Sequence, residues 1–214
     1  KHDCIIGVSG GKDSTMQALW IREKLGLNPL LICLTYPPEQ VNQLGVENLS
    51  NLIELGFDIH TISLAPQTWR KLMYLSFKNF TNWCKSTELA LFSAVPRLAI
   101  EYEIPLVLWG ENPALQLGDL KTLGETGYDG NSIRNMNTLG GGSLKWIIEE
   151  GFTESELIGY QYPEPEEFEK NNIQIIYLGW FLGDLSLINI GVYSCFNGIE
   201  IKDALVFSNQ LKNL

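Results

Sequence analysis

Five short apolar runs recur along the chain, and segments with a helical spacing of apolar residues separate them. The runs are residues 4–8, 30–34, 57–64, 106–109 and 173–178. Nearly continuous apolar runs are typical of strands that are buried on both faces of a parallel sheet. Strands that alternate with helices form right-handed βαβ units. The sequence therefore predicts an α/β fold with a doubly wound, mostly parallel five-stranded sheet and helices on both faces.

The predicted helices occupy residues 14–25, 46–56, most of 66–103, and 144–150. Pro96 is expected to kink or restart the helix that contains it. Residues 163–169 predict an acidic turn, and 111–142, rich in Gly and Asn, a long functional loop. We expect residues 1–180 to form one domain and residues 181–214 a C-terminal extension.

Charge and composition narrow the class of protein. Asp and Glu outnumber Lys and Arg by 25 to 15 in the 214 residues, which gives a net charge of −10. Such a chain is poorly suited to neutralise many phosphates, so no nucleic-acid partner is expected. The 45% of hydrophobic residues is enough for a core and excludes global disorder. Neither a membrane span nor a signal peptide is indicated, so we expect a cytoplasmic protein without a membrane partner.

The cysteines and histidines do not form a recognisable site. Four cysteines lie far apart in the sequence, and the chain has two histidines. Their spacing predicts neither a zinc site nor a Cys–His hydrolase. Cys4 and Cys33 lie in strand-like runs, as buried thiols do in proteins of a reducing cytosol.

The segment from Ser9 to Ser14, SGGKDS, stands directly between the first predicted strand and the first predicted helix. Its two glycines permit unusual backbone angles and the close approach of a ligand. The start of the helix supplies unpaired N–H groups and the positive end of the helix dipole. Two serine hydroxyls and the Lys12 charge add to these groups. The segment therefore predicts a binding site for a phosphate or pyrophosphate.

Two common phosphate motifs do not fit this segment. A Walker A loop needs Ser or Thr after Gly-Lys, but Asp13 follows Lys12 here. The GxGxxG dinucleotide fingerprint fails because Gly7 and Gly10 have the wrong spacing.

SGGKDS instead resembles the PP-loop of the N-type ATP pyrophosphatase superfamily, whose pattern is SGGxDS after the first strand. The resemblance implies a fold of the HUP-like adenine nucleotide α-hydrolase type and a reaction that uses ATP and Mg²⁺. A substrate oxygen would attack the α-phosphorus, and AMP and pyrophosphate would be released. The residues that it assigns to ATP are Ser9, Gly10, Gly11, Lys12, Asp13, Ser14 and Gly110.

The resemblance also implies roles for two side chains of the loop. Lys12 would stabilise the negative charge that builds on the leaving pyrophosphate. Asp13 would hold the metal, directly or through water. The alternative for Asp13 is a carboxylate that interacts only with the helix dipole.

A narrower resemblance rests on WGENP at 109–113 and NTLGGG at 137–142. These segments are similar to the N-acetyl sugar amidotransferases of bacterial surface-polysaccharide (lipopolysaccharide O-antigen) biosynthesis. The subgroup implies an ATP-dependent amidotransferase that adenylylates the acetamido oxygen of an N-acetyl sugar or nucleotide sugar. Ammonia from a glutaminase subunit would then replace that oxygen. The subgroup carries a cysteine-rich segment before the loop, where this sequence has only Cys4, so we expect a fragment or a short member.

Several residues are candidates for the sugar site, each with a simpler alternative. Glu111 is expected to act as a base or metal ligand, and Asn112 to bind the acetamido group; the alternative is loop solvation and an Asx turn before Pro113. Gly140, Gly141 and Gly142 would form a second phosphate nest or a flexible turn.

Arg97 and Arg134 are candidates for a sugar carboxylate or phosphate, with a surface charge as the favoured alternative. We expect four tryptophans to be core residues rather than stacking platforms, namely Trp20, Trp83, Trp146 and Trp180. Two further readings of the whole chain stay open at this point, namely a PP-loop enzyme that modifies tRNA and a nucleotide-binding module without turnover.

Overall fold

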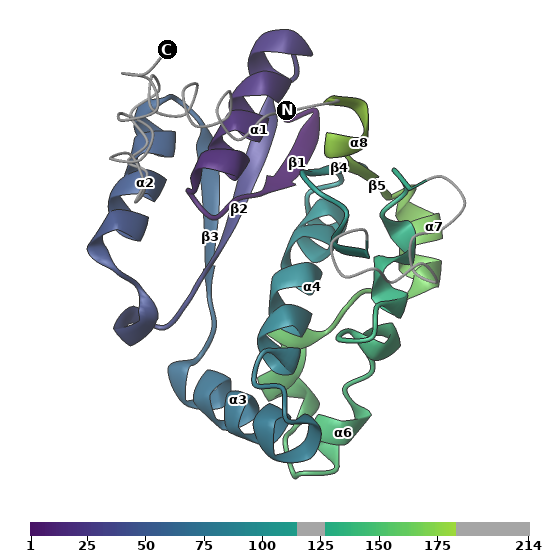
Figure 1. Cartoon of the computed structure of the whole chain (residues 1–214). Coiled ribbons are helices and arrows are strands. Elements are labelled where there is room, and N and C mark those ends of the chain that lie inside the picture. The colour runs from purple at the N-terminus through teal and green to yellow at the C-terminus, as the bar shows by residue number, and fades with distance from the viewer. Residues whose placement is uncertain (115–126, 183–214) are drawn as a thin grey trace, which may run out of the picture.

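Five strands form one parallel sheet in the computed structural model, which describes residues 1–114 and 127–182. They are β1 (Cys4–Gly7), β2 (Pro29–Thr35), β3 (Asp58–Ser63), β4 (Leu106–Trp109) and β5 (Gln174–Tyr177). Every pairing between them is parallel, and their order is β3-β2-β1-β4-β5. The predicted α/β fold with a five-stranded sheet is confirmed (Figure 1).

The helices follow the predicted apolar spacing closely. They are α1 (Lys12–Lys24), α2 (Gln43–Glu54), α3 (Pro66–Phe80), α4 (Lys85–Glu101), α6 (Lys145–Ile148), α7 (Pro165–Asn171) and α8 (Gly179–Leu182). Short 3-10 turns are η1 (Pro38–Gln40), η2 (Asn131–Asn135), η3 (Gly140–Gly142) and η4 (Glu154–Tyr160). None of the helices in the described part of the chain is long and apolar enough to cross a membrane.

Two expectations about helices are corrected. α4 continues through Pro96, which is buried inside it, so the helix is not restarted there. The break in the predicted 66–103 segment lies at Thr81, whose left-handed backbone (φ 53°) ends α3. The predicted acidic turn is the start of α7, because Glu164 and Glu167 form a reciprocal capping box and Pro165 occupies the first turn.

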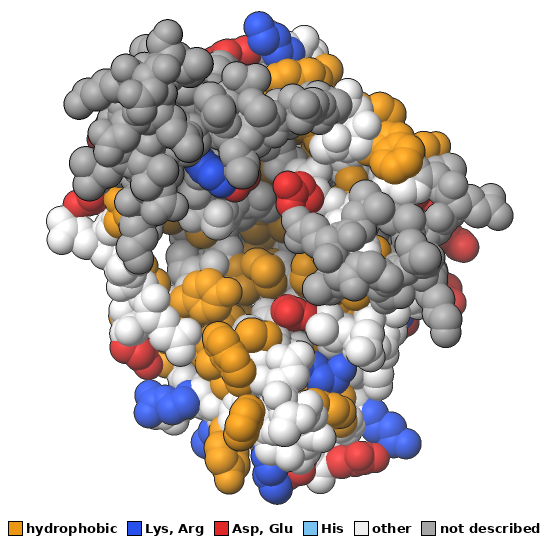
Figure 2. Space-filling view, in the orientation of Figure 1, with side chains coloured by type: hydrophobic (Ala, Val, Ile, Leu, Met, Phe, Trp, Pro, Cys, Tyr) orange, Lys and Arg blue, Asp and Glu red, His pale blue; other side chains and the backbone are white. Residues whose placement is uncertain are grey.

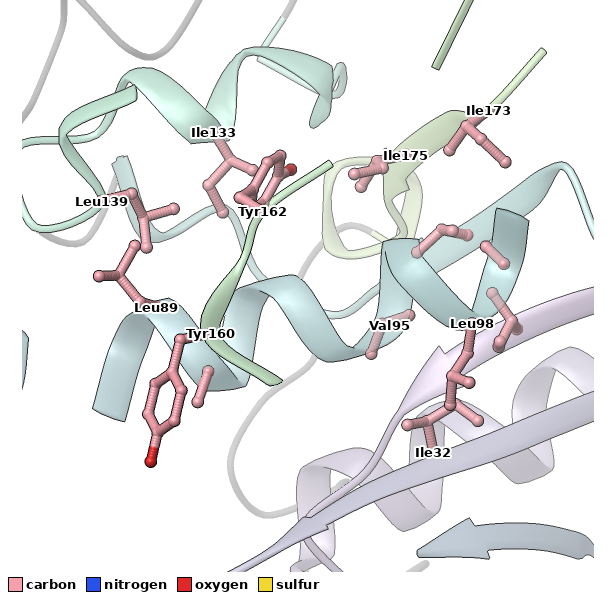
Figure 3. Packing of buried hydrophobic residues seen from close by; sticks show 14 of the residues in the cluster. Ile32, Leu89, Val95, Leu98, Ile133, Leu139, Tyr160, Tyr162, Ile173 and Ile175 are labelled. Atoms are coloured by element: carbon pink, nitrogen blue, oxygen red, sulfur yellow. The ribbon is translucent and has the colours of Figure 1, made fainter. Parts of the chain in front are cut away.

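Alternate residues of β1 enter two separate cores, one on each face of the sheet. Ile5 packs with α3, α4 and the segments around η2 and η4. Ile6 packs with α1 and α2 on the other face. Figure 3 shows the first core, with Leu98 of α4 beside Ile32 of β2 and Leu89 towards Leu139. The sheet is therefore covered on both faces, as expected for a doubly wound fold.

The strand order reverses at β1. β2 and β3 lie on one side of β1, whereas β4 and β5 lie on the other. In open parallel sheets, ligands bind beyond the carboxyl ends of the strands at such a reversal. The topology therefore directs attention to the residues that follow Gly7 and Trp109. The expected extension falls outside the described residues from 183 onwards, as do residues 115–126 of the expected long loop.

Candidate active site

The SGGKDS segment forms the turn that leads from β1 into α1. Gly10 has a left-handed backbone with φ +78°. A Cβ atom at Gly10 would lie 3.1 Å from the backbone nitrogen of Leu49 in α2. Gly11 has an ordinary backbone, and a Cβ there would meet only the Ser9 hydroxyl, at 3.4 Å. Gly10 is thus required by the fold, whereas Gly11 leaves space on the outer side of the turn.

The two serines of the turn hold its backbone in place. The Ser14 hydroxyl donates to the carbonyl oxygen of Gly11 at 3.1 Å and accepts from the Ser9 N–H at 3.3 Å. The Gly11 N–H donates to the Ser9 hydroxyl at 3.3 Å. In the described chain, no side chain caps the start of α1 at Gly11. The turn therefore directs the helix N-terminus outward in a geometry that favours an anion.

Lys12 and Asp13 form an ion pair at the start of α1. The Lys12 Nζ lies 2.6 Å from Asp13 Oδ2, and the two side chains are 26% and 64% exposed. Both charges are therefore within reach of a ligand on the turn.

A cavity of about 350 Å³ opens beside this turn. Ser9 and Ser14 line it from one side, and Gly110 and Glu111 line it from the end of β4. The remaining walls are mostly apolar and come from β2 and α4. Figure 2 shows a hollow in the middle of this face with hydrophobic side chains around it. The structure thus brings the predicted phosphate loop together with Gly110 and Glu111, at the edge of the sheet that the topology indicates.

Gln17 connects the two sides of this cavity, and sequence reasoning missed it. Its side chain is buried in α1, and Nε2 donates to the carbonyl oxygen of Leu108 at 3.1 Å. A Cβ at Gly110 would lie 3.2 Å from Gln17 Oε1. A polar residue between the apolar residues Met16 and Ala18 is the signal in the sequence that could have found it.

The segment after β5 holds the same turn from the other side. The N–H of Leu178 donates to the Trp109 carbonyl oxygen, and that of Gly179 donates to the Gly110 carbonyl oxygen, both at 2.7 Å. A Cβ at Gly179 would lie only 2.8 Å from that oxygen. Glu111 therefore follows a backbone that is fixed by both α1 and β5.

Two exposed carboxylates, Asp13 at the start of α1 and Glu111 at the cavity, suit a metal ion that arrives with phosphates. Mg²⁺ is commonly held by one or two carboxylates together with substrate phosphates. Asp13 and Glu111 are exposed, and they supply such a sparse set. In the described chain, no group of three or more His, Cys, Asp and Glu could hold a metal by itself. The donors fit Asp13 as a ligand of nucleotide-bound magnesium rather than a preformed protein cage.

Asn112, a predicted substrate ligand, is 6% exposed and is engaged by the protein. Its side-chain nitrogen donates to the Gly127 carbonyl oxygen, and its oxygen accepts from the Ala114 N–H, both at 2.9 Å. The second contact is the Asx turn that the sequence left as the alternative. In these contacts Asn112 holds the loop after β4.

Gly140, Gly141 and Gly142 form η3, and the last two line a separate cavity of about 410 Å³. Arg134 lines that cavity, donates to the Gly141 carbonyl oxygen at 2.8 Å and pairs with Glu164 at 3.0 Å. The cavity beside SGGKDS is not lined by these glycines, as far as the described residues show. The structure therefore does not bring the predicted second nest to the phosphate loop.

Other predicted residues are also accounted for by local contacts. Arg97 is half-buried, donates to the Ile158 carbonyl oxygen and does not line the cavity beside the loop. Trp20 and Trp146 are partly buried and pack against the cores. Trp83 and Trp180 are 55% and 54% exposed, so the expectation that they are core residues is wrong.

Comparisons with known proteins give distant structural likenesses. No protein-family model and no curated protein matches the sequence. The chain is similar to a solved structure described as a predicted subunit of tRNA methyltransferase from Methanocaldococcus jannaschii. The identity is 19%, 91% of this chain and 76% of that chain are covered, and the TM-score is 0.43. It is also similar to the U34-tRNA thiolase NcsA from Methanococcus maripaludis, solved with its 4Fe-4S cluster, with 17% identity, 95% and 76% coverage and a TM-score of 0.38. The fold assignment rests on the sheet topology itself.

The expectation of an N-acetyl sugar amidotransferase is corrected here. The similar structures are described as tRNA-modifying proteins, and the surface-polysaccharide function is not supported. The geometry explains why the motif misled, because Asn112 holds a turn and Gly140 to Gly142 lie at another cavity. The expected glutaminase partner remains a prediction that belongs to that reaction. The phosphate loop and its neighbour Glu111 are unaffected by this correction.

Proposed function

We propose that this chain is an ATP-dependent enzyme of the N-type ATP pyrophosphatase kind, which transfers the adenylyl group of ATP to an oxygen of its substrate. The observation that carries the proposal is the complete SGGKDS turn at the carboxyl end of β1, where the strand order reverses. The hydrogen bonds of Ser9 and Ser14 preorganise that turn. Preorganised donors are the arrangement that stabilises charge developing in a transition state.

The chemistry follows from the position of the turn. Its N–H groups and Lys12 hold the β- and γ-phosphates. A substrate oxygen attacks the α-phosphorus, a new P–O bond forms, and the bond to the bridging oxygen breaks. The electron pair of that bond leaves with pyrophosphate, and Lys12 offsets the charge that results. Asp13 and Glu111 are the residues that would hold magnesium, which when bound adds positive charge at the phosphates.

The acceptor that we propose is a base in tRNA. Support comes from α3, which carries Arg70, Lys71 and Lys78 and contains no Asp or Glu. The same helix exposes Tyr74 (68%) and Phe77 (55%), and aromatic and basic side chains on one surface suit single-stranded nucleic acid. Figure 2 shows Lys and Arg side chains beside hydrophobic ones at the lower end of the molecule, where Figure 1 places α3. The net charge of −10 stands against this acceptor, so binding must be local to such a surface.

The inner face of α3 packs against a residue that lines the cavity. Trp69, on the inner face of α3, packs edge-on against Tyr36 with ring centroids 5.3 Å apart. Tyr36 lines the cavity beside the phosphate loop. The inner face of α3 thus meets the cavity, whereas the basic and aromatic side chains lie on its outer face.

Radiolabelled ATP tests both parts of the proposal. The full chain is incubated with Mg²⁺, unfractionated tRNA and ATP labelled at the α-phosphorus. We expect release of pyrophosphate and label on the tRNA. Water then hydrolyses the adenylylated base and releases AMP. Lys12→Met should lower the rate about 100-fold or more, the range for loss of one stabilising group. Lys24→Met is the matched control, because Lys24 is exposed at the opposite end of the same helix.

The products decide the outcome. ADP and orthophosphate as the only products, or an undiminished rate in Lys12→Met, would contradict adenylyl transfer. If AMP forms at the same rate with and without tRNA, adenylyl transfer is supported, but tRNA as the acceptor is contradicted. Binding of ATP without turnover in any of these mixtures would favour the nucleotide-binding module.

A further inference from the structure

Gln17 places an amide in a buried part of α1. Its side chain is 6% exposed, and its neighbours in the sequence, Met16 and Ala18, are buried as well. A buried amide costs free energy unless it is hydrogen-bonded, whereas an apolar side chain of similar size carries no such cost. The packing of α1 on the sheet therefore does not by itself account for an amide at this position.

Both ends of the Gln17 amide contact the end of β4. The nitrogen Nε2 donates to the carbonyl oxygen of Leu108 at 3.1 Å. The oxygen Oε1 lies against Gly110, because a Cβ atom there would be 3.2 Å from it. The backbone of Gly110 is not in the left-handed region, so the conformation of the chain does not require glycine at 110. The glycine at 110 leaves space for the amide instead.

Gln17 also continues the connection between the two central strands. β1 and β4 are paired at two positions, Ile5 with Val107 and Ile6 with Leu108. The amide of Gln17 is bonded at the second of these pairs, at the carboxyl end of the sheet. It therefore joins α1 to β4 where the two strands lead into the cavity.

The two elements that Gln17 joins carry opposite sides of the proposed site. Asp13 and Ser14 precede Gln17 by four and three positions on α1, which is about one helical turn. Gly110 and Glu111 line the cavity from the end of β4. One side chain thus connects the helix that begins in the phosphate loop to the peptide that precedes Glu111.

We propose that Gln17 is a positioning residue that sets the separation between the phosphate loop and the Glu111 carboxylate. The inference rests on the proposed function, in which Asp13 and Glu111 would hold magnesium at the phosphates of ATP. Mg²⁺ requires a nearly ideal octahedral arrangement of oxygen ligands, so the separation of the two carboxylates matters. A hydrogen bond depends on direction and distance, and it fixes this separation more closely than an apolar contact does.

Gln17→Met tests the proposal, because it keeps a long side chain but removes the amide. Pyrophosphate release in the presence of tRNA should fall by about tenfold to 100-fold, as expected for a catalytic group that is displaced on the order of 1 Å. ATP titrated without Mg²⁺ should bind as it does to the wild type, because the hydrogen bonds of the phosphate loop remain. The gain in ATP affinity on addition of Mg²⁺ should be smaller than in the wild type.

Ser93→Ala is the matched control. Ser93 is a buried polar residue of α4 whose hydroxyl donates to the carbonyl oxygen of Gly159 at 3.2 Å, and it does not line the cavity. Its loss removes a contact of the same kind from another part of the fold. This variant should keep the wild-type rate and the wild-type gain from Mg²⁺ when both chains are folded, as followed by tryptophan fluorescence.

Gln17→Glu adds a pH dependence that a loss of packing would not give. A neutral carboxyl group can donate its O–H to the Leu108 carbonyl oxygen, whereas a carboxylate cannot donate. Burial raises the pKa of a carboxyl group, so the neutral form persists to higher pH than in water. The rate relative to the wild type should therefore be highest at low pH and should fall as the pH rises. The relative rate of Gln17→Met should not change in this way.

The outcomes separate this inference from the proposed function. A wild-type chain that releases no pyrophosphate overturns both. Wild-type turnover with an unchanged rate in Gln17→Met overturns only the role of Gln17. Equal losses of rate in Gln17→Met and Ser93→Ala would reveal a general effect of stability, and would likewise overturn the assignment.

Discussion

At Gly10 both the fold and the proposed chemistry require a residue without a Cβ atom. Its left-handed backbone and the nearby backbone of α2 exclude a side chain there. Gly11 differs, because its backbone is ordinary and its surroundings are open. Substitutions at the two glycines therefore distinguish the residue that the turn needs, Gly10, from the residue that leaves space for the ligand, Gly11.

Gly10→Ala should therefore lower the free energy of unfolding by about 1–3 kcal/mol, the usual cost of a strained backbone position. ATP affinity should fall with it. Gly11→Ala should change the unfolding free energy by less than about 0.5 kcal/mol, as surface substitutions usually do, and still weaken ATP binding. Denaturant unfolding followed by tryptophan fluorescence measures the first quantity, and ATP titration the second. Equal stability of Gly10→Ala and the wild type would refute this account of the turn.

Single residues were predictable from the sequence where a local motif determines them. SGGKDS needs only a strand before it and a helix after it, and Glu111 follows a strand end that points to the same edge. Asn112 and Gln17 were not predictable in this way. Their roles depend on partners at Gly127 and Leu108, which lie 15 and 91 positions away.

At the scale of elements, apolar spacing predicted where the strands and helices lie, but it did not predict which of their side chains are exposed. α3 buries Trp69 and Leu72, as the spacing indicates, but Phe80 of the same spacing is exposed. The exposed aromatic residues on the other side could not be distinguished from core residues by type alone. The missed helix α7 has a different cause, because its capping pair was read as a cluster of acidic residues.

The outer face of α3 provides the prediction for this scale. Replacing Arg70, Lys71 and Lys78 together with Gln should weaken tRNA binding in low salt. The slope of log affinity against log salt should decrease by about 2–3, since each phosphate contact contributes roughly 0.7–0.9. Filter binding over a salt series measures this slope.

Lys24→Gln with Lys170→Gln is the control, because both lysines are exposed on other helices. An unchanged slope in the triple variant, or an equal loss in the control, would show that α3 is not the RNA-binding surface.

At the scale of the whole molecule, the labelling rates of three cysteines can be used to follow unfolding of the chain. Burial, with a smaller contribution from Asp3, raises the pKa of Cys4 to about 12, and burial also raises that of Cys33. Cys84 is only partly buried, and burial and the charge of Glu88 raise its thiol pKa. A raised pKa leaves less of the reactive thiolate at neutral pH.

In a Cys195→Ser background, a thiol reagent at pH 7.5 should therefore modify Cys84 first and slowly. The rate at Cys84 should rise with pH, because the thiolate fraction rises. Cys4 and Cys33 should react only as the chain unfolds, so their rates should follow global stability. Mass spectrometry of the labelled peptides assigns each rate. Rapid labelling of Cys4 in the folded chain would contradict the burial of β1 between two helical layers.

The contact between Gly179 and Gly110 restricts which residues can occupy position 179. The segment after β5 is far from SGGKDS in the sequence, but the N–H groups of Leu178 and Gly179 fix the peptide just before Glu111. A side chain at position 179 would lie against the Gly110 carbonyl oxygen, even with every residue of the phosphate loop intact. The position of the Glu111 carboxylate thus depends on the edge of the sheet at β5.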